Sequence, residues 1–272
     1  MEKQASYIKR IEIRGLWGWK NIAWELRPDV NILAGVNGIG KSSILNASVG
    51  RLDRTMQQPG LGMQVNIDFE PADATFVRYD VIRSFDRPLL RSDLLEKMAE
   101  KDVRTELDWQ VYQLQRRYLD YQVNVGNRMI ELLTDGDPEA RTRAEEVSLP
   151  KRRFQDMVDR LFGETGKRID RRSNEIRFVQ GDEVLCPYQL SSGEKQMLVI
   201  LLTALVQDGQ PAVLFMDEPE VSLHIEWQQQ LITLVRELNP QVQIILTTHS
   251  PAVIMDGWLD AVTEVSDISS TK

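Results

Sequence analysis

The stretch that decides the fold is Gly35-Val36-Asn37-Gly38-Ile39-Gly40-Lys41-Ser42-Ser43, which fits the phosphate-loop pattern G-x-x-x-x-G-K-[ST]. Residues 30–34 before it form an apolar run of strand length, and residues 43–47 after it have the composition of a helix start. In a strand–loop–helix unit, glycines let successive backbone N–H groups point at a phosphate, and the helix N-terminus adds partial positive charge. The context therefore predicts a nucleotide phosphate site rather than an ordinary glycine-rich turn.

Two side chains of this loop have predicted tasks of their own. Lys41 is expected to reach the β- and γ-phosphates of a nucleotide, and the Ser42 hydroxyl is expected to be a ligand of Mg²⁺. The candidate nucleotide-binding residues of the loop are Gly35, Asn37, Gly38, Ile39, Gly40, Lys41, Ser42 and Ser43.

The composition of the 272-residue chain is that of an ordinary globular protein, with 42% hydrophobic and 27% charged residues. The formal net charge of −8 gives no general reason to expect nucleic acid or an acidic membrane surface as a partner. Cys186 is the single cysteine of the sequence, so no internal disulfide can form, and a reducing cytoplasm is the expected location. The N-terminus lacks an apolar signal-peptide core, and the longest apolar run, residues 197–206, is too short to span a bilayer. We therefore expect no membrane insertion.

Two short stretches ahead of the loop alternate apolar and polar residues. They cover residues 8–13 and 22–26, and a turn-rich link joins them. This pattern predicts an antiparallel β-hairpin that leads into the strand before the phosphate loop. Trp17 and Trp19 in the link could stack on an adenine base or pack within the hairpin, and the sequence favours neither.

The middle of the chain has helical periodicity. Apolar residues recur at spacings of three and four, as on one face of a helix, at Leu107, Val111, Leu114, Tyr118, Tyr121, Val125, Met129 and Leu132. We expect this stripe to be the seam of a local helical hairpin with a second helix at residues 151–162, although a short dimerisation coiled coil would use the same pattern. We therefore predict an inserted helical lobe at residues 86–180 within a single domain of residues 1–272.

The charge of this region differs from that of the rest. Residues 101–172 hold 15 Lys and Arg against 14 Asp and Glu, so this segment is nearly neutral whereas the whole chain carries −8. Its densest basic clusters are residues 151–153 and 167–172. Such clusters are usually solvated surface, but they are also where DNA could contact the lobe.

The last third of the chain alternates buried strands with helices. Unbroken apolar runs at residues 213–216 and 242–246 suit the centre of a parallel sheet, and residues 225–238 between them have the pattern of a helix. Together with residues 30–34, these elements predict an α/β fold with a mostly parallel sheet covered by helices.

Two acidic residues follow the first of these strands. A phosphate loop needs a magnesium partner, usually an acidic residue at the end of a neighbouring apolar strand, and Asp217 is in that position. Glu218 can accept a proton from the water that attacks the γ-phosphate. His249 follows the other strand at the same carboxyl edge, where α/β sheets gather their ligands. We therefore expect Lys41, Glu218 and His249 to be the catalytic residues.

Residues 190–194, Leu-Ser-Ser-Gly-Glu, predict a second anion site. Ser191 and Glu194 have the spacing of a capping box, so a helix should begin here. A small-residue loop with a hydroxyl at a helix N-terminus can bind a phosphate, which makes Ser191, Gly193 and Glu194 further nucleotide-binding candidates. Two phosphate-facing sites in one chain suggest that the nucleotide is shared between two subunits.

With these motifs in this order, the chain resembles ATPases of the ABC superfamily. Residues 35–42 match the phosphate loop, residues 190–194 the signature (family form L-S-G-G-Q), residues 213–218 the Walker B strand, and His249 the switch histidine. Residues 217–224, Asp-Glu-Pro-Glu-Val-Ser-Leu-His, resemble the OLD-like form D-E-P-E-x-x-L-H, so the chain is more similar to the soluble SMC/RecF/OLD-like branch than to transporters.

The chain also departs from the family pattern. Ser192 and Glu194 stand where the signature usually has Gly and Gln, and no glutamine has a context that assigns it to the Q-loop. The separation of 150 positions from Lys41 to Ser191 leaves no room for arms of SMC length.

The resemblance implies a P-loop NTPase fold of ABC type, ATP and Mg²⁺ as cofactors, hydrolysis of ATP to ADP and phosphate, and a head-to-tail dimer that closes on ATP. The expected function is a nucleotide-gated dimeric regulator or clamp for a protein effector or DNA. Stand-alone ATPases of this kind often accompany a separate effector, for instance in bacterial anti-phage (antiviral defence) systems, which is an argument by analogy. The alternatives are the ATP-binding subunit of a transporter, or an ATP-sensing scaffold with little hydrolysis.

Overall fold

The computed structural model describes residues 2–53, 62–83, 102–134 and 138–271, which gather into two compact units. The first unit takes its residues from Met1–Ser84, Gln210–Thr233 and Gln241–Lys272, and the second from Phe85–Gly209 and Leu234–Pro240. The predicted lobe at residues 86–180 falls within the second unit, which continues to residue 209. That residues 1–272 act as one domain with an inserted lobe stays a prediction.

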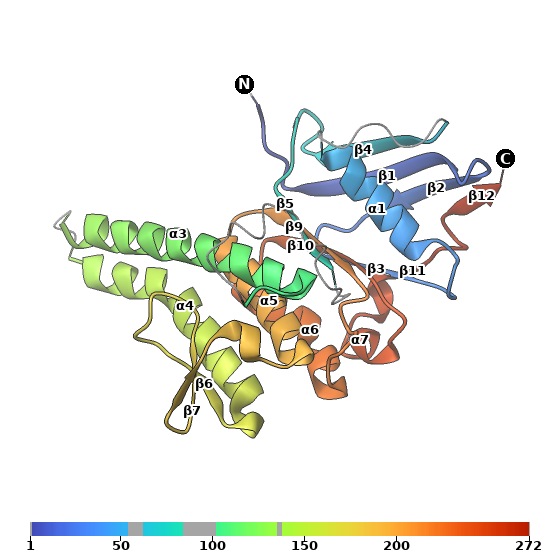
Figure 1. Cartoon of the computed structure of the whole chain (residues 1–272). Helices are drawn as coiled ribbons and strands as arrows, with labels where there is room; N and C mark the ends of the chain where they lie inside the picture. Colours follow the sequence, from blue (N-terminus) through green and yellow to red (C-terminus); the bar gives the residue numbers. More distant parts are fainter. Residues whose placement is uncertain (1, 54–61, 84–101, 135–137, 272) are drawn as a thin grey trace. The chain divides into compact units, whose positions relative to one another are not determined.

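A five-stranded parallel sheet in the first unit carries the predicted phosphate loop (Figure 1). In spatial order its strands are β11 (Val262–Glu264), β3 (Val30–Ala34), β10 (Val242–Thr247), β9 (Ala212–Asp217) and β5 (Tyr79–Arg83). Every residue of β3 and β10 is buried, as is typical of central parallel strands. Because β10 lies between β3 and β9, the carboxyl ends of these three strands meet at one edge of the sheet.

A second sheet in the same unit is antiparallel. Its strands, in spatial order, are β12 (Ser269–Thr271), β2 (Lys20–Glu25), β1 (Tyr7–Leu16) and β4 (Gln64–Glu70). The pairing of β1 with β2 confirms the predicted hairpin. Helix α1 (Lys41–Leu52) contacts strands of both sheets, and its Ile44, Leu45 and Val49 join one apolar core with residues of β1, β3 and β9. This packing fixes the start of α1, and with it the phosphate loop.

Two further helices of this unit stand next to β10 in the sequence, one before it and one after it. They are α6 (Ile225–Leu238), whose last residues belong to the second unit, and α7 (Pro251–Met255). Helix α6 has the bounds that the sequence predicts, and together with β3, β9 and β10 it confirms the α/β fold with a parallel sheet.

In the described part of the second unit, three helices pack together: α3 (Glu106–Thr134), α4 (Ala140–Phe162) and α5 (Ser192–Val206). The predicted apolar stripe of α3 is buried from Leu107 to Val125, so it forms a local seam. A small antiparallel sheet completes the unit, with strands β6 (Lys167–Ile169), β7 (Phe178–Gln180) and β8 (Glu183–Leu185).

Helix α4 begins eleven residues before the predicted start at Lys151, so that prediction was wrong at its N-terminal end. Proline is best tolerated in the first turn of a helix, since in the interior it removes a backbone hydrogen bond. In the structure Pro150 lies inside the helix, and buried Ala140 and Ala144 continue its inner face toward the N-terminus. Burial of that face outweighs the hydrogen bond that proline removes. Within the described residues, no helix is both long enough and apolar enough to cross a bilayer.

Candidate functional site

Glycines give the phosphate loop its backbone shape. Gly35, Gly38 and Gly40 all have positive φ angles, of 142°, 79° and 113°. A side chain at Gly40 would also collide with Trp17, because a Cβ atom there would lie 2.8 Å from the indole ring. Gly40 caps α1, so the helix N-terminus opens directly onto the loop, as the motif predicts.

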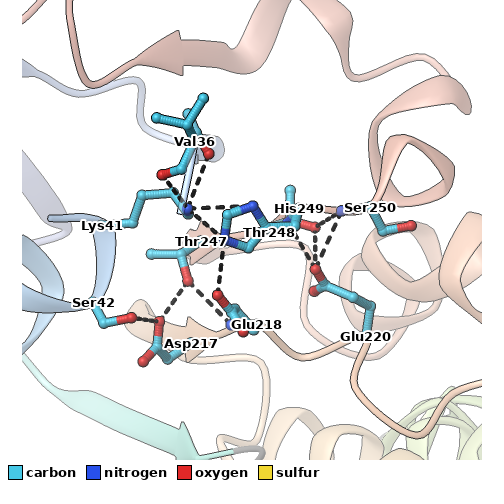
Figure 2. A network of polar contacts seen from close by, with 11 residues as sticks. Val36, Lys41, Ser42, Asp217, Glu218, Glu220, Thr247, Thr248, His249 and Ser250 are labelled. Carbon is cyan, nitrogen blue, oxygen red and sulfur yellow. Dashed lines mark hydrogen bonds and ion pairs between the residues drawn. The ribbon is translucent and has the colours of Figure 1, made fainter. Parts of the chain in front are cut away.

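Lys41, the first residue of α1, is almost fully buried, and its ammonium group points back into the loop. Its Nζ donates to the carbonyl oxygens of Gly35 at 3.0 Å and Val36 at 3.4 Å, and it lies within hydrogen-bonding distance of His249 Nε2 (Figure 2). A cation held over the loop backbone in this way is placed to meet phosphate oxygens.

The predicted magnesium ligands meet at the next strand end. The Ser42 hydroxyl donates to Asp217 Oδ1 at 2.9 Å, and Thr247 Oγ1 donates to the same oxygen at 2.6 Å (Figure 2). Thr247 pairs with Asp217 across β10 and β9, so the sheet register brings these groups together. Mg²⁺ commonly binds one or two protein oxygens together with phosphate oxygens, and Ser42 with Asp217 fits that pattern. The described residues contain no cluster of three or more His, Cys, Asp or Glu that could hold a metal by themselves.

Glu218 and His249 face each other at the same edge. Glu218 has a φ angle of 48°, unusual for a residue with a side chain, and its Oε1 lies 3.0 Å from His249 Nε2. A neutral imidazole can accept from Lys41 through Nε2, whereas a protonated one can donate to Glu218 through the same atom. His249 follows β10, the middle strand, which is why its ring reaches both neighbours.

These side chains open onto one cavity of about 560 Å³ in the first unit. Its walls include Trp17, Lys41, Ser42, Glu218 and His249. The other predicted loop residues on its walls are Asn37, Gly38, Gly40 and Ser43. The structure therefore brings six of the eight predicted loop residues, including Lys41, together with Glu218 and His249 around a single space, whereas Gly35 and Ile39 are not on its walls.

Two residues of the site were missed by the sequence analysis. Thr247 binds Asp217 through its hydroxyl, and Glu220 accepts three hydrogen bonds from residues 248–250. A threonine after an apolar strand and a second acid in the Asp-Glu-Pro-Glu stretch were visible signals. Their meaning depended on which strand lies in the middle of the sheet, which the sequence does not state.

The predicted signature residues belong to the second unit. Ser191 is the N-cap of α5 and forms the predicted capping box with Glu194. The carboxylate of Glu194 is buried and already has partners, since it accepts from Ser191 N, Thr165 Oγ1 and Lys167 Nζ at 2.8–2.9 Å. This favours a structural task for Glu194, while Ser191 is exposed and Gly193 follows it at the helix start. Nucleotide binding by all three stays a prediction.

Glu194→Gln is expected to destabilise the second unit by about 1–3 kcal/mol, since hydrogen bonds to a charged group are lost. Burial alone would raise the pKa of Glu194, but the hydrogen bonds from Ser191, Lys167 and Thr165 outweigh it and lower the pKa below 4.5. A lowered pKa means that the stabilisation is present above pH 4.5 and fades as the pH falls further. The difference in thermal unfolding midpoint between the variant and the wild type should therefore be smaller at pH 4 than at pH 7. Glu183→Gln, an exposed acid in β8, is the control.

Trp17 and Trp19 differ in their position relative to the cavity. Both are about half exposed, but Trp17 covers Gly40 and forms a wall of the cavity, while Trp19 is not among the cavity residues. Trp17→Ala should weaken ATP binding by about 5- to 100-fold, the scale of one base stacked on an aromatic ring. Trp19→Ala should not, and tripolyphosphate, which lacks a base, should compete equally well in all three proteins. Equal ATP affinity in Trp17→Ala would assign Trp17 to packing alone.

The fold and the site together define an α/β P-loop NTPase that resembles SMC head domains. The structure of the SmcHead bound to the C-winged helix domain of ScpA matches with a TM-score of 0.54 at 14% identity, over 98% of this chain and 97% of that one. Residues 80–256 match the protein family described as "AAA domain, putative AbiEii toxin, Type IV TA system". The chain belongs to this family, an AAA-type ATPase domain family.

Two individual relatives are similar to the chain over different lengths. Septu protein PtuA of Bacillus thuringiensis is 24% identical over 308 residues, a match that covers 91% of this chain and 72% of PtuA. The glutathione import ATP-binding protein GsiA of Salmonella typhimurium is 31% identical over 87 residues, which is 30% of this chain and 14% of GsiA. Similarity to PtuA therefore extends along most of the chain, whereas similarity to the import protein is confined to a short part.

Proposed function

We propose that this chain binds ATP with Mg²⁺, hydrolyses it to ADP and phosphate, and uses the bound nucleotide to gate a partner effector. One observation carries the proposal. Lys41 and Ser42 from the start of α1, Glu218 after β9 and His249 after β10 line one cavity. Membership of an AAA-type ATPase family supports the same chemistry.

In the binding step, the loop backbone and the α1 N-terminus would face the phosphates, and Lys41 would exchange its carbonyl partners for β- and γ-phosphate oxygens. Ser42 and Asp217 would hold Mg²⁺, which neutralises phosphate charge when bound. Asp217 would then share its carboxylate between the metal and Thr247, whose hydroxyl fixes its orientation.

In the hydrolysis step, Glu218 would accept a proton from the water that attacks the γ-phosphorus, while the bond to the β–γ bridging oxygen breaks. His249 would contact the γ-phosphate. Its ring lies between Lys41 and Glu218, so it can respond to the arrival and loss of the γ-phosphate.

A protein effector is better supported than DNA. Lys151 of the first basic cluster donates to Gln122 at 2.6 Å, and burial lowers its pKa. Arg171 of the second cluster pairs with Asp156 and Asp159, both at 2.6 Å. In contrast, α3 leaves three apolar side chains more than half exposed, namely Val123, Ile130 and Leu133. Their spacings of seven and three residues place them on roughly one face of the helix, and an exposed apolar face is typical of a protein contact.

Phosphate release and binding of a fluorescent ATP analogue by the purified chain test the proposal. We expect Mg²⁺-dependent turnover, and we expect Lys41→Ala to weaken binding at least about tenfold because the mobile cation of the loop is gone. Tight binding without turnover would favour the sensing scaffold. Equal binding by Lys41→Ala and the wild type would show that the loop is not the nucleotide site.

A further inference from the structure

One buried carboxylate holds the turn that carries His249. Glu220 Oε1 accepts from the Thr248 hydroxyl at 2.6 Å, from the His249 backbone N–H at 2.9 Å and from the Ser250 backbone N–H at 3.3 Å (Figure 2). The side chain is 9% exposed, so these bonds form largely away from water. Hydrogen bonds to a carboxylate are about twice as strong as neutral ones.

This turn follows the end of β10 and is not part of the sheet. Strand β10 ends at Thr247, and within the described residues the His249 backbone N–H bonds to the carboxylate of Glu220 instead of to a neighbouring strand. The Ser250 backbone N–H donates to the Thr248 hydroxyl oxygen at 2.9 Å as well as to Glu220. The His249 ring points the other way, toward Lys41 and Glu218 (Figure 2). We infer that Glu220 is a positioning residue, which fixes the backbone of His249 so that its ring faces the γ-phosphate position.

The same short segment carries the proposed general base. Glu218 and Glu220 are two residues apart, and the turn between them is closed by Val221 N–H, which donates to the Glu218 carbonyl at 3.2 Å. Gln228 of α6 ties the other side, since it accepts from Ser250 Oγ at 2.6 Å and donates to the Leu223 carbonyl at 2.9 Å. These hydrogen bonds connect the segment that carries Glu218 to the turn that carries His249, although the two residues follow different strands. The inference rests on the proposed hydrolysis of ATP.

The expected result for Glu220→Ala is a loss in turnover of about 10²-fold, the cost of a group misplaced by about 1 Å. Affinity for ATP should stay within about twofold, because the phosphate loop is untouched. Glu220→Gln keeps an acceptor oxygen for all three donors, so it should restore turnover to within about fivefold of wild type. Its amide would occupy the position of Glu220 Oε2, a buried atom that has no hydrogen-bond partner among the residues the structure describes, so this variant should unfold at a lower temperature.

A double variant distinguishes a positioning role of Glu220 from a general structural role. If Glu220 acts through His249, Glu220→Ala combined with His249→Ala should be no slower than His249→Ala alone. Additive losses would overturn the inference. Glu226→Ala, which removes an exposed acid at the start of α6, is the control for turnover and stability.

A second measurement does not depend on hydrolysis. The chain has two histidines, so selective labelling of imidazole Cε1 gives two NMR signals, which His249→Gln assigns. Glu220→Ala should shift or broaden the His249 signal, Glu220→Gln should leave it near its wild-type position, and Glu226→Ala should change neither. An unmoved His249 signal in Glu220→Ala would refute the inference even in an active enzyme. A shifted signal in a protein that never hydrolyses ATP would refute the proposed function instead.

Discussion

Replacing Glu218 with glutamine is expected to lower ATP turnover by about 10²-fold or more, the scale of a lost general base, while ATP binding persists. Glu218 lies one residue beyond Asp217, and its φ angle of 48° turns its side chain toward His249. Glutamine has nearly the same shape but cannot take the proton from the attacking water. The loop contacts of Lys41 are unaffected by the change, so the nucleotide should still bind.

Single-turnover phosphate release and equilibrium binding of the same protein measure the two effects separately. Glu226→Gln, the same acid-to-amide change at an exposed position, should hydrolyse ATP as the wild type does. Turnover of Glu218→Gln at the wild-type rate would show that another group accepts the proton. Weakened binding in this variant would instead place Glu218 among the nucleotide contacts.

The parts of the fold that the sequence predicts well are those with strong local signals. Strand β3 and helix α6 have the predicted bounds, because an unbroken apolar run and a clear helical period each leave one solution. Strands β6 and β8 were not predicted, since each has three residues and too short a pattern to detect. The start of α4 was predicted eleven residues too late, because the packing that buries Ala140 and Ala144 is not visible in the local sequence.

Most residues of the candidate site were named from the sequence, but Thr247, Glu220 and the contacts between the residues were not. The apolar run of β9 predicts that Asp217 and Glu218 lie at the end of a strand, and the apolar run of β10 predicts the same for His249. Only the spatial order β3-β10-β9 explains why His249 reaches both Lys41 and Glu218, and why Glu220 reaches the turn after β10. Long-range strand order is a property of the folded sheet, and no local pattern encodes it.

Ser191→Arg is expected to lower ATP turnover by at least about 10²-fold, while the variant still binds ATP through its own phosphate loop. Ser191 is the exposed N-cap of α5, and a helix N-terminus contributes on the order of 0.5–1 kcal/mol to a nearby anion. We propose that this end meets the γ-phosphate bound by a second subunit, so that a two-fold dimer contains two shared sites. An arginine would block that contact. Light scattering of the Glu218→Gln protein should then show dimers with ATP and not with ADP.

Mixing two inactive variants decides whether the site is shared. Lys41→Ala keeps an intact signature and Ser191→Arg keeps an intact phosphate loop, so a mixed dimer has one complete site and one that lacks both parts. With random pairing, an equal mixture should recover up to about a quarter of wild-type turnover, because half the dimers are mixed and each has one of two sites. Mixing Lys41→Ala with a Lys41→Ala/Ser191→Arg double variant provides the control, since no pairing of these chains completes a site. If activity never returns in the first mixture, although both variants fold and Ser191→Arg binds ATP, each chain hydrolyses ATP without the signature of another.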